Sequence, residues 1–335
     1  MKKYLLLICM ILVISLVPVS GCTPEDDTSI GMAVEFMDHA ACAYIGQDKG
    51  WFEEAGLDVT AYESYITGMA LSSALTRGDI QVAYMCLVPA VNAYANAEVP
   101  IKIVAGTHKY GYGLVVNPEK IKNVNDLEQP GIRIGCVREG GAVDVLLRKT
   151  IDTYGLDESN ILGNIQRMNP PKLALSIKLD QLDAAFMPEQ WATMAEDYGF
   201  KMLLMSQDIW PDMQGSVLVV RESLINDSPD TVKKLIEVSQ RAIDWGNKNP
   251  EEAATIVAHQ MNSVGGNLYP SEQIEAVTKL EITPDVLLRS MERLDYTSDI
   301  DPKMVQEIID YIGELEYIKS SFDATDILDL RFIEK

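Results

Sequence analysis

Short apolar runs alternate with amphipathic helical patterns from residue 30 onward, and this alternation restricts the chain to an α/β architecture. The runs Gly31–Phe36 and Leu57–Tyr62 have the length of buried strands, and residues 40–55 between them have a helical pattern. Strands that alternate with helices in this way predict largely parallel sheets with helices on their faces. The alternation starts again at Ile132–Val137, after a break at Pro118, so we expect two α/β lobes.

The chain changes character at Ser228, where successive helical patterns replace the alternation. Its length of 335 residues also exceeds the usual size of a single hydrophobic core. We therefore predict a discontinuous first lobe of residues 31–115 and 220–335, and a second lobe of residues 116–219. The chain would cross between the lobes near Val115 and Val219, and a ligand cleft would lie between them.

The N-terminus has the three parts of a secretory signal. These are a basic start at Lys2 and Lys3, an apolar run over residues 4–17, and small residues before Cys22. The apolar run is shorter than the roughly 20 residues of a membrane-spanning helix. Val-Ser-Gly-Cys at residues 19–22 looks like a lipobox, so we predict removal of residues 1–21, acylation of Cys22 and a tether over residues 22–30. Cleavage without a lipid and a short uncleaved anchor are the alternatives.

These features place the protein outside the cytoplasmic membrane, in the periplasm or at the cell surface. Its 50 acidic and 28 basic side chains give a net charge of −22. Nucleic acids and anionic lipids bind proteins through Lys and Arg, so neither is an expected partner. We predict a monomer that contacts the membrane through its lipid alone, although a salty habitat would explain the acidity equally well.

Cysteine and histidine are too few and too scattered for a disulfide framework or a metal site. Cys42, Cys86 and Cys136 remain after the signal and the anchor cysteine are set aside, and the chain has only three histidines. We expect the three cysteines to be small buried side chains. The sequence therefore predicts neither a metal nor another cofactor.

Three segments resemble the substrate-binding proteins of ABC importers, of the nitrate/sulfonate/taurine type and the thiamine-precursor type. Residues 44–59, YIGQDKGWFEEAGLDV, resemble the opening helix and the signature that follows it. Residues 67–80 resemble the family's loop, helix and glycine turn, with Gln81 where an acidic residue is common. Residues 181–191 resemble the strand that leads to a Glu-Pro pair, but Asp180 replaces a glycine and the pair is reversed as Pro188-Glu189.

The resemblance implies the type II periplasmic-binding-protein fold, in which two lobes close on a small solute and deliver it to a membrane permease without catalysis. It leaves the solute open between an organic anion, such as a sulfonate, and a planar heterocycle, such as a thiamine precursor. A sensory subunit is an alternative function. An enzyme similar to thiamine-pyrimidine synthases is another, but the chain lacks their cysteine-rich iron-binding stretch and carries an export signal.

Ligands of open α/β sheets gather beyond the carboxyl ends of the strands and at the N-termini of the helices that follow. That rule selects the loops at residues 37–41, 64–69, 85–88, 106–110, 138–142 and 187–191. We predict ligand contacts by residues in or beside these loops: His39, Tyr65, Thr67, Gly68, Tyr110, Tyr112, Arg138, Gly140, Gly141, Glu189 and Trp191.

Each type of side chain suggests a different contact. The glycines at 68, 140 and 141 would expose helix N–H groups to an anion, although Gly140-Gly141 is equally well explained as a plain strand–helix turn. Arg138 can pair with an acidic solute, or it forms a surface pair beside Glu139. His39 either donates a hydrogen bond to the ligand or caps the next helix. The four aromatic residues can stack on a planar solute.

Overall fold

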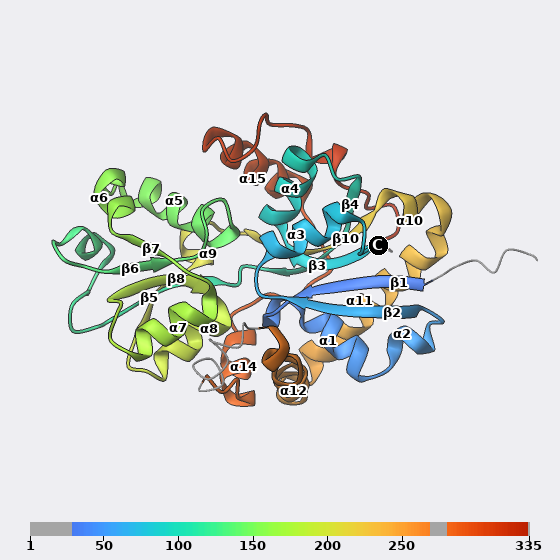
Figure 1. Cartoon of the computed structure of the whole chain (residues 1–335), viewed down its shortest axis with the longest axis horizontal. Helices are drawn as coiled ribbons and strands as arrows, with labels where there is room; N and C mark the ends of the chain where they lie inside the picture. The colour runs from blue at the N-terminus through green and yellow to red at the C-terminus, as the bar shows by residue number, and fades with distance from the viewer. Residues whose placement is uncertain (1–28, 269–279, 334–335) are drawn as a thin grey trace, which may run out of the picture.

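The computed structural model describes residues 29–268 and 280–333. The signal, Cys22, nearly all of the tether and nearly all of a helix expected over residues 271–280 lie outside these ranges. Two five-stranded sheets form the centres of two lobes (Figure 1). This is the two-lobed α/β architecture that the alternating pattern predicts.

The first sheet has the strand order β2-β1-β3-β10-β4. Its strands are β1 (Ser29–Glu35), β2 (Asp58–Tyr65), β3 (Val82–Cys86), β4 (Ile101–Lys109) and β10 (Gln214–Arg221). One face is covered by α3 (Gly68–Arg77) and α4 (Leu87–Ala97). The other is covered by α1 (Ala41–Asp48), α2 (Trp51–Glu54), α11 (Pro229–Lys248) and α12 (Pro250–Leu268).

The second sheet has the strand order β7-β6-β8-β5-β9. Its strands are β5 (Tyr112–Val116), β6 (Ile134–Cys136), β7 (Ile165–Arg167), β8 (Ala184–Pro188) and β9 (Lys201–Met205). Its helices are α5 (Ala142–Tyr154), α6 (Glu158–Gly163), α7 (Pro170–Lys178), α8 (Glu189–Glu196) and α9 (Ser206–Ile209).

The remaining elements belong to the connections and to the C-terminal part. Short 3-10 helices lie at Asp38–Ala40 (η1), Val124–Glu128 (η2) and Ala324–Asp326 (η3). After α10 (Glu222–Asp227), the C-terminal helices include α14 (Pro284–Met291) and α15 (Pro302–Glu314). Helix α14 packs on α8 of the second lobe, whereas α15 packs on α4 of the first (Figure 1).

Both sheets are mixed rather than purely parallel. β10 runs antiparallel to β3 and β4, and β5 runs antiparallel to β8 and β9. Each of these strands enters its sheet from the other lobe, so it starts at the edge where the neighbouring strands end. The chain crosses between the lobes earlier than expected at both places. Residues 112–115 already pair in the second sheet, and residues 214–219 already pair in the first.

One predicted strand was wrong at its start. Ile161–Gln166 reads as a strand in the sequence, but residues up to Gly163 belong to α6, and β7 begins only at Ile165. A short apolar run has no periodicity that separates a strand from a helix, and Asp157 caps α6 by accepting a hydrogen bond from the Asn160 N–H at 3.1 Å.

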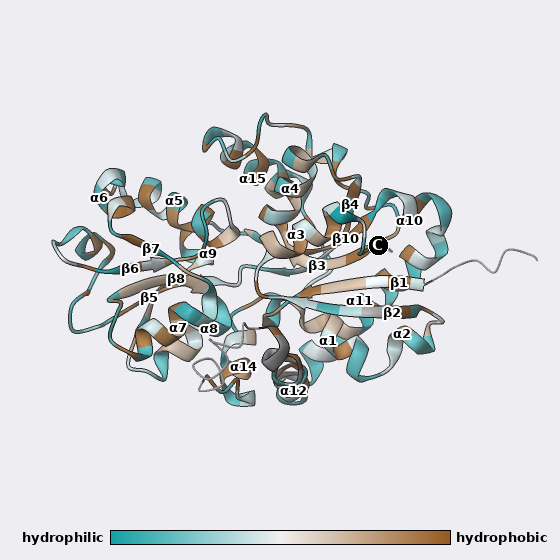
Figure 2. Ribbon diagram, in the orientation of Figure 1, coloured by the Kyte–Doolittle hydropathy of each residue, from teal (hydrophilic) through white to brown (hydrophobic). Residues whose placement is uncertain are grey.

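The apolar core runs along both sheets. Every residue of β3, β5 and β8 is buried, and Figure 2 shows hydrophobic strands inside an outer layer of helices with hydrophilic faces. Burial of one large apolar side chain contributes about 2 kcal/mol. The cysteines Cys42, Cys86 and Cys136 are buried, as expected, and form no disulfide within the described part of the chain. Within the described ranges, no helix is both long and apolar enough to cross a lipid bilayer.

Candidate functional site

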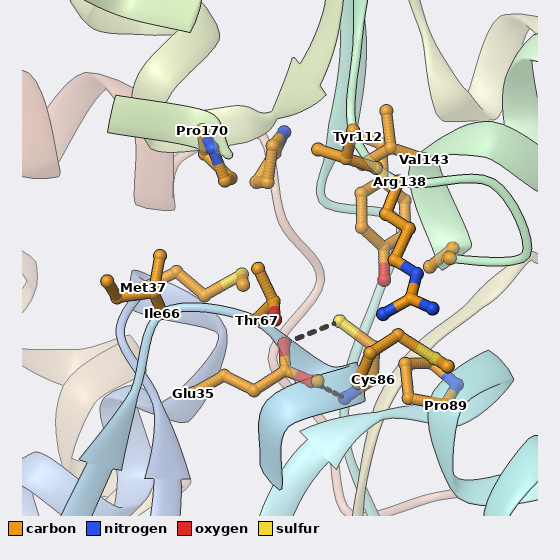
Figure 3. Close-up of a pocket in the computed structure, with 16 residues that line it drawn as sticks. Glu35, Met37, Ile66, Thr67, Cys86, Pro89, Tyr112, Arg138, Val143 and Pro170 are labelled. Atoms are coloured by element: carbon orange, nitrogen blue, oxygen red, sulfur yellow. Dashed lines mark hydrogen bonds between the residues drawn. The ribbon is translucent and has the colours of Figure 1, made fainter. Parts of the chain in front are cut away.

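A pocket of about 440 Å³ lies between the two lobes. This figure includes space that is open to solvent at the mouth of the pocket. The first lobe contributes Glu35, Met37, Ile66, Thr67, Gly68, Met69, Cys86 and Pro89, and the second contributes Tyr112, Val137, Arg138, Gly141, Ala142, Val143, Pro170 and Pro188. Figure 3 shows these side chains facing one another across the space.

Several helices direct their N-termini at this pocket, because they follow strands whose carboxyl ends meet there. Thr67 is the N-cap of α3 and accepts a hydrogen bond from the Ala70 N–H at 3.3 Å. Gly141 and Pro188 are the N-caps of α5 and α8, and Pro170 is the first residue of α7. The partial positive charge of these helix ends favours negative charge or hydrogen-bond acceptors in the pocket.

A buried carboxylate lies in the first-lobe wall of the pocket. Glu35 ends β1 and is 1 % exposed. Its Oε1 accepts a hydrogen bond from the Cys86 N–H at 3.1 Å, and its Oε2 accepts one from the Cys86 thiol at 2.9 Å (Figure 3). Burial raises the pKa of Glu35 to about 7, although both bonds from Cys86 act to lower it. Gly68 lies against the same carboxylate.

Arg138 and Tyr112 provide the polar groups of the second-lobe wall. Arg138 is exposed and also borders a second, more open groove between α3, α4 and the start of α5. Its side chain forms no hydrogen bond or ion pair with any residue of the described ranges, and Glu139, the alternative surface partner, pairs instead with Arg148 at 3.0 Å. Tyr112 is buried and places its ring edge-on against His39.

His39 lies behind the pocket instead of lining it. Its Nε2 is 2.7 Å from the Gly111 carbonyl, and its ring centroid is 4.3 Å from that of His108. It does not cap the helix that follows it, since neither η1 nor α1 has a side-chain cap. Burial, followed by the nearby His108, holds the pKa of His39 well below its usual value. His39 therefore supports the crossing at Gly111 as a neutral ring.

The remaining predicted residues lie outside the pocket. Tyr65 donates a hydrogen bond to Glu63 at the outer edge of β2, and the Tyr110 N–H bonds the Met213 carbonyl at the crossing. Gly140 borders the open groove and accepts a hydrogen bond from Asn92 at 2.9 Å. Trp191 is buried in α8 near Phe36. The structure brings together Thr67, Gly68, Tyr112, Arg138 and Gly141 of the predicted set.

Glu189 also points away from the pocket. It is 1 % exposed and accepts a hydrogen bond from Arg293 at 3.0 Å and another from Thr193 at 3.1 Å. The reversed Pro188-Glu189 order places Pro188 at the end of β8, in the pocket wall, and Glu189 at the first position of α8. Burial raises the pKa of Glu189, and Arg293 opposes the shift.

Cys86 and His39 are adjacent but are not an activated nucleophile and base. The thiol sulfur lies 3.7 Å from His39 Nδ1. Burial, with the nearby Glu35 carboxylate, raises the pKa of the Cys86 thiol well above its usual value, while the pKa of His39 is lowered. A nucleophilic cysteine requires the opposite, a thiolate stabilised by a cation.

Sequence reasoning missed Glu35, Pro89, Val137, Val143 and Pro170 in the wall. Only Glu35 gave a signal that could have been used, because it is the one charged residue in the apolar run Gly31–Phe36. A charged side chain inside a buried strand is rare and usually paired or functional. The other four are apolar residues whose contact with the pocket depends on the packing of the lobes.

Comparison with known proteins identifies the family. The sequence profile of the NMT1-like family matches residues 23–261, more than half of the chain. The chain belongs to the NMT1-like family. A Brucella abortus protein is 27 % identical over 249 residues, which are 73 % of this chain and 74 % of the relative. This relative is named as a binding protein, and its name gives no ligand.

Solved structures share the fold of this NMT1-like protein. The ligand-binding component of an ABC-type import system from Staphylococcus aureus, with zinc bound, has a TM-score of 0.72 at 17 % identity and covers 91 % of this chain and 97 % of its own. The alkanesulfonate-binding protein of Xanthomonas axonopodis, bound to MOPS, has a TM-score of 0.73 at 13 % identity, with coverages of 90 % and 98 %. The nitrate-binding protein of Synechocystis has a TM-score of 0.69 at 14 % identity, with coverages of 90 % and 84 %. The predicted periplasmic-binding-protein fold and the resemblance to this group are confirmed.

Proposed function

We propose that this protein is the solute-binding subunit of an ABC importer, which captures a small solute between its lobes and delivers it to a membrane permease. The observation that carries the proposal is the pocket between the lobes, whose wall comes from both of them. A solute that contacts both walls at once favours the closed arrangement over an open one. Binding-protein relatives and importer components of the same fold support this function.

The protein acts outside the cytoplasmic membrane as a monomer, held there by an acyl chain on Cys22. The secretory signal and the lipobox of the sequence support this location. The protein catalyses no reaction, an assignment supported by the protonated Cys86 thiol beside a neutral His39. A sensory subunit would use the same pocket, and neighbouring genes for a permease and an ATPase would favour transport over sensing.

A thermal-shift screen of small sulfonates, carboxylates, amines, amidines and nitrogen heterocycles tests the capture of a solute. A solute that binds only the folded protein raises its melting temperature by mass action. Small-angle scattering of the same complex should give a smaller radius of gyration than the ligand-free protein. A solute that binds tightly but leaves the radius unchanged would contradict closure of the two lobes.

A further inference from the structure

Glu35 is a buried acid that has no ion-pair partner among residues 29–268 and 280–333. It is 1 % exposed, and within the described part of the chain its carboxylate oxygens accept hydrogen bonds only from the N–H and the thiol of Cys86. No lysine, arginine or histidine of that part forms an ion pair with it. A carboxylate can accept about four hydrogen bonds, and these contacts use two of them. A buried charge without a counter-charge is costly, so Glu35 is ionised near neutral pH only where a further partner, such as a bound solute, stabilises its charge.

The two bonds from Cys86 show which protonation state the geometry fits. Oε1 faces the backbone N–H and Oε2 faces the thiol, so both oxygens act as acceptors. A protonated carboxyl would turn one oxygen into a donor, and neither Cys86 group is a good acceptor for it. The arrangement suits an ionised Glu35, and a donor from the solute would stabilise that form further.

Glu35 also occupies the place where an anion would meet the first lobe. A Cβ on Gly68, the first residue of α3, would lie 2.0 Å from Glu35 Oε1, so the carboxylate lies directly against this helix end. The same oxygen accepts the Cys86 N–H at the N-terminus of α4. An acidic group of the solute would therefore bind at the second-lobe wall, where Arg138 and Gly141 line the pocket.

We propose that the solute carries a nitrogen hydrogen-bond donor, such as a protonated amine, an amidine or the amino edge of a heterocycle, and that Glu35 accepts it. This inference rests on the proposed function, and it makes Glu35 the residue that selects among solutes. Any acidic group of the same solute faces Arg138. Met37, Ile66 and Val143 add apolar contacts to the pocket. Glu35 and Arg138 are the charged groups of its wall, so they determine which charges of a solute are accepted.

Matched pairs of probes test the inference by calorimetry. The pairs are benzamidine with benzoate, aminopropanesulfonate with propanesulfonate, and aminopyrazine with methylpyrazine. We expect the donor-bearing member of a pair to bind the wild-type protein about 10-fold to 100-fold more tightly, the range for one hydrogen bond to a charged group. Glu35→Gln should remove this preference, and Arg138→Gln should instead weaken the sulfonates. Glu53→Gln, on an exposed position of α2, is the matched control and should bind as the wild type does.

The outcomes separate this inference from the proposed function. Donor-free anions that bind as tightly as their partners, or a donor preference that survives in a folded Glu35→Gln protein, would overturn the role of Glu35 and leave solute capture intact. Cys86→Ser changes the same wall but keeps a donor beside Glu35, so it should retain the preference for donors. A preference that is lost in Glu35→Gln and kept in Cys86→Ser is then due to the Glu35 carboxylate and not to a general disturbance of the wall. If neither these probes nor any solute of the thermal-shift screen binds the wild-type protein, solute capture itself fails.

Discussion

Gly68 shows how closely the pocket wall is packed around Glu35. A Cβ at this position would lie 2.0 Å from Glu35 Oε1 and 2.6 Å from Pro89 Cγ, which forces the carboxylate or the first turn of α3 to move. We expect Gly68→Ala to lower the free energy of unfolding by about 1–3 kcal/mol, the usual cost of overpacking. Urea unfolding measures this change. Gly163→Ala in α6 is the control, because its Cβ would meet no atom within 4 Å; equal losses in the two variants would contradict the steric account.

Single residues of the pocket were predictable where a local rule fixes them. Thr67 and Gly68 follow a strand and begin a helix. Their place at the helix N-terminus was sufficient to predict that they line the pocket. Glu35 was not found although it is the one charged residue of its apolar run, because the sequence does not show which neighbours its side chain meets. Glu189 was predicted from the family pattern, but its partner Arg293 is far along the chain and turns it away from the pocket.

At the scale of elements, an ion pair links α8 to the chain just after α14. Arg293 lies 3.0 Å from Glu189 and 2.8 Å from Glu196, and the Glu189 side chain is 2 % exposed. Arg293→Met would leave Glu189 buried without its cation, so we expect a loss of about 3 kcal/mol in the free energy of unfolding. Adding Glu189→Gln should recover part of it. Arg331→Met removes a pair with Asp329 in which the arginine is 64 % exposed, and it should cost less than about 1 kcal/mol.

The elements themselves were largely predictable, and their assignment to sheets was less so. The apolar run Tyr112–Val116 suits a strand, but such a pattern cannot state which sheet a strand joins. That choice depends on its pairing with β8 and β9, which are distant in sequence. For the same reason, the antiparallel placement of β10 followed from the return of the chain between the lobes and not from any pattern within residues 214–221.

At the scale of the whole molecule, hydroxyl groups of the first lobe reach carboxylates of the second. Tyr311 donates to Asp152 at 2.6 Å and Tyr317 donates to Asp144 at 2.5 Å, both on α5. Burial raises the pKa of both tyrosines, which keeps them protonated as donors. The contacts exist only while the lobes are together, so they stabilise the closed arrangement relative to an open one.

Replacing both tyrosines by phenylalanine removes the two hydroxyls and keeps the rings. Each hydrogen bond to a carboxylate is worth about 1.5 kcal/mol, so the closed arrangement should lose about 100-fold in population relative to the open one. An identified solute should bind the variant more weakly because binding must first restore closure, and the ligand-free variant should have a radius of gyration no smaller than that of the ligand-free wild-type protein. Tyr94→Phe is the matched control, since the Tyr94 hydroxyl has no hydrogen-bond partner within the described ranges. An unchanged radius together with unchanged affinity would mean that these contacts do not bear on closure, and the lobes would then be held by the pocket and the α14 side alone.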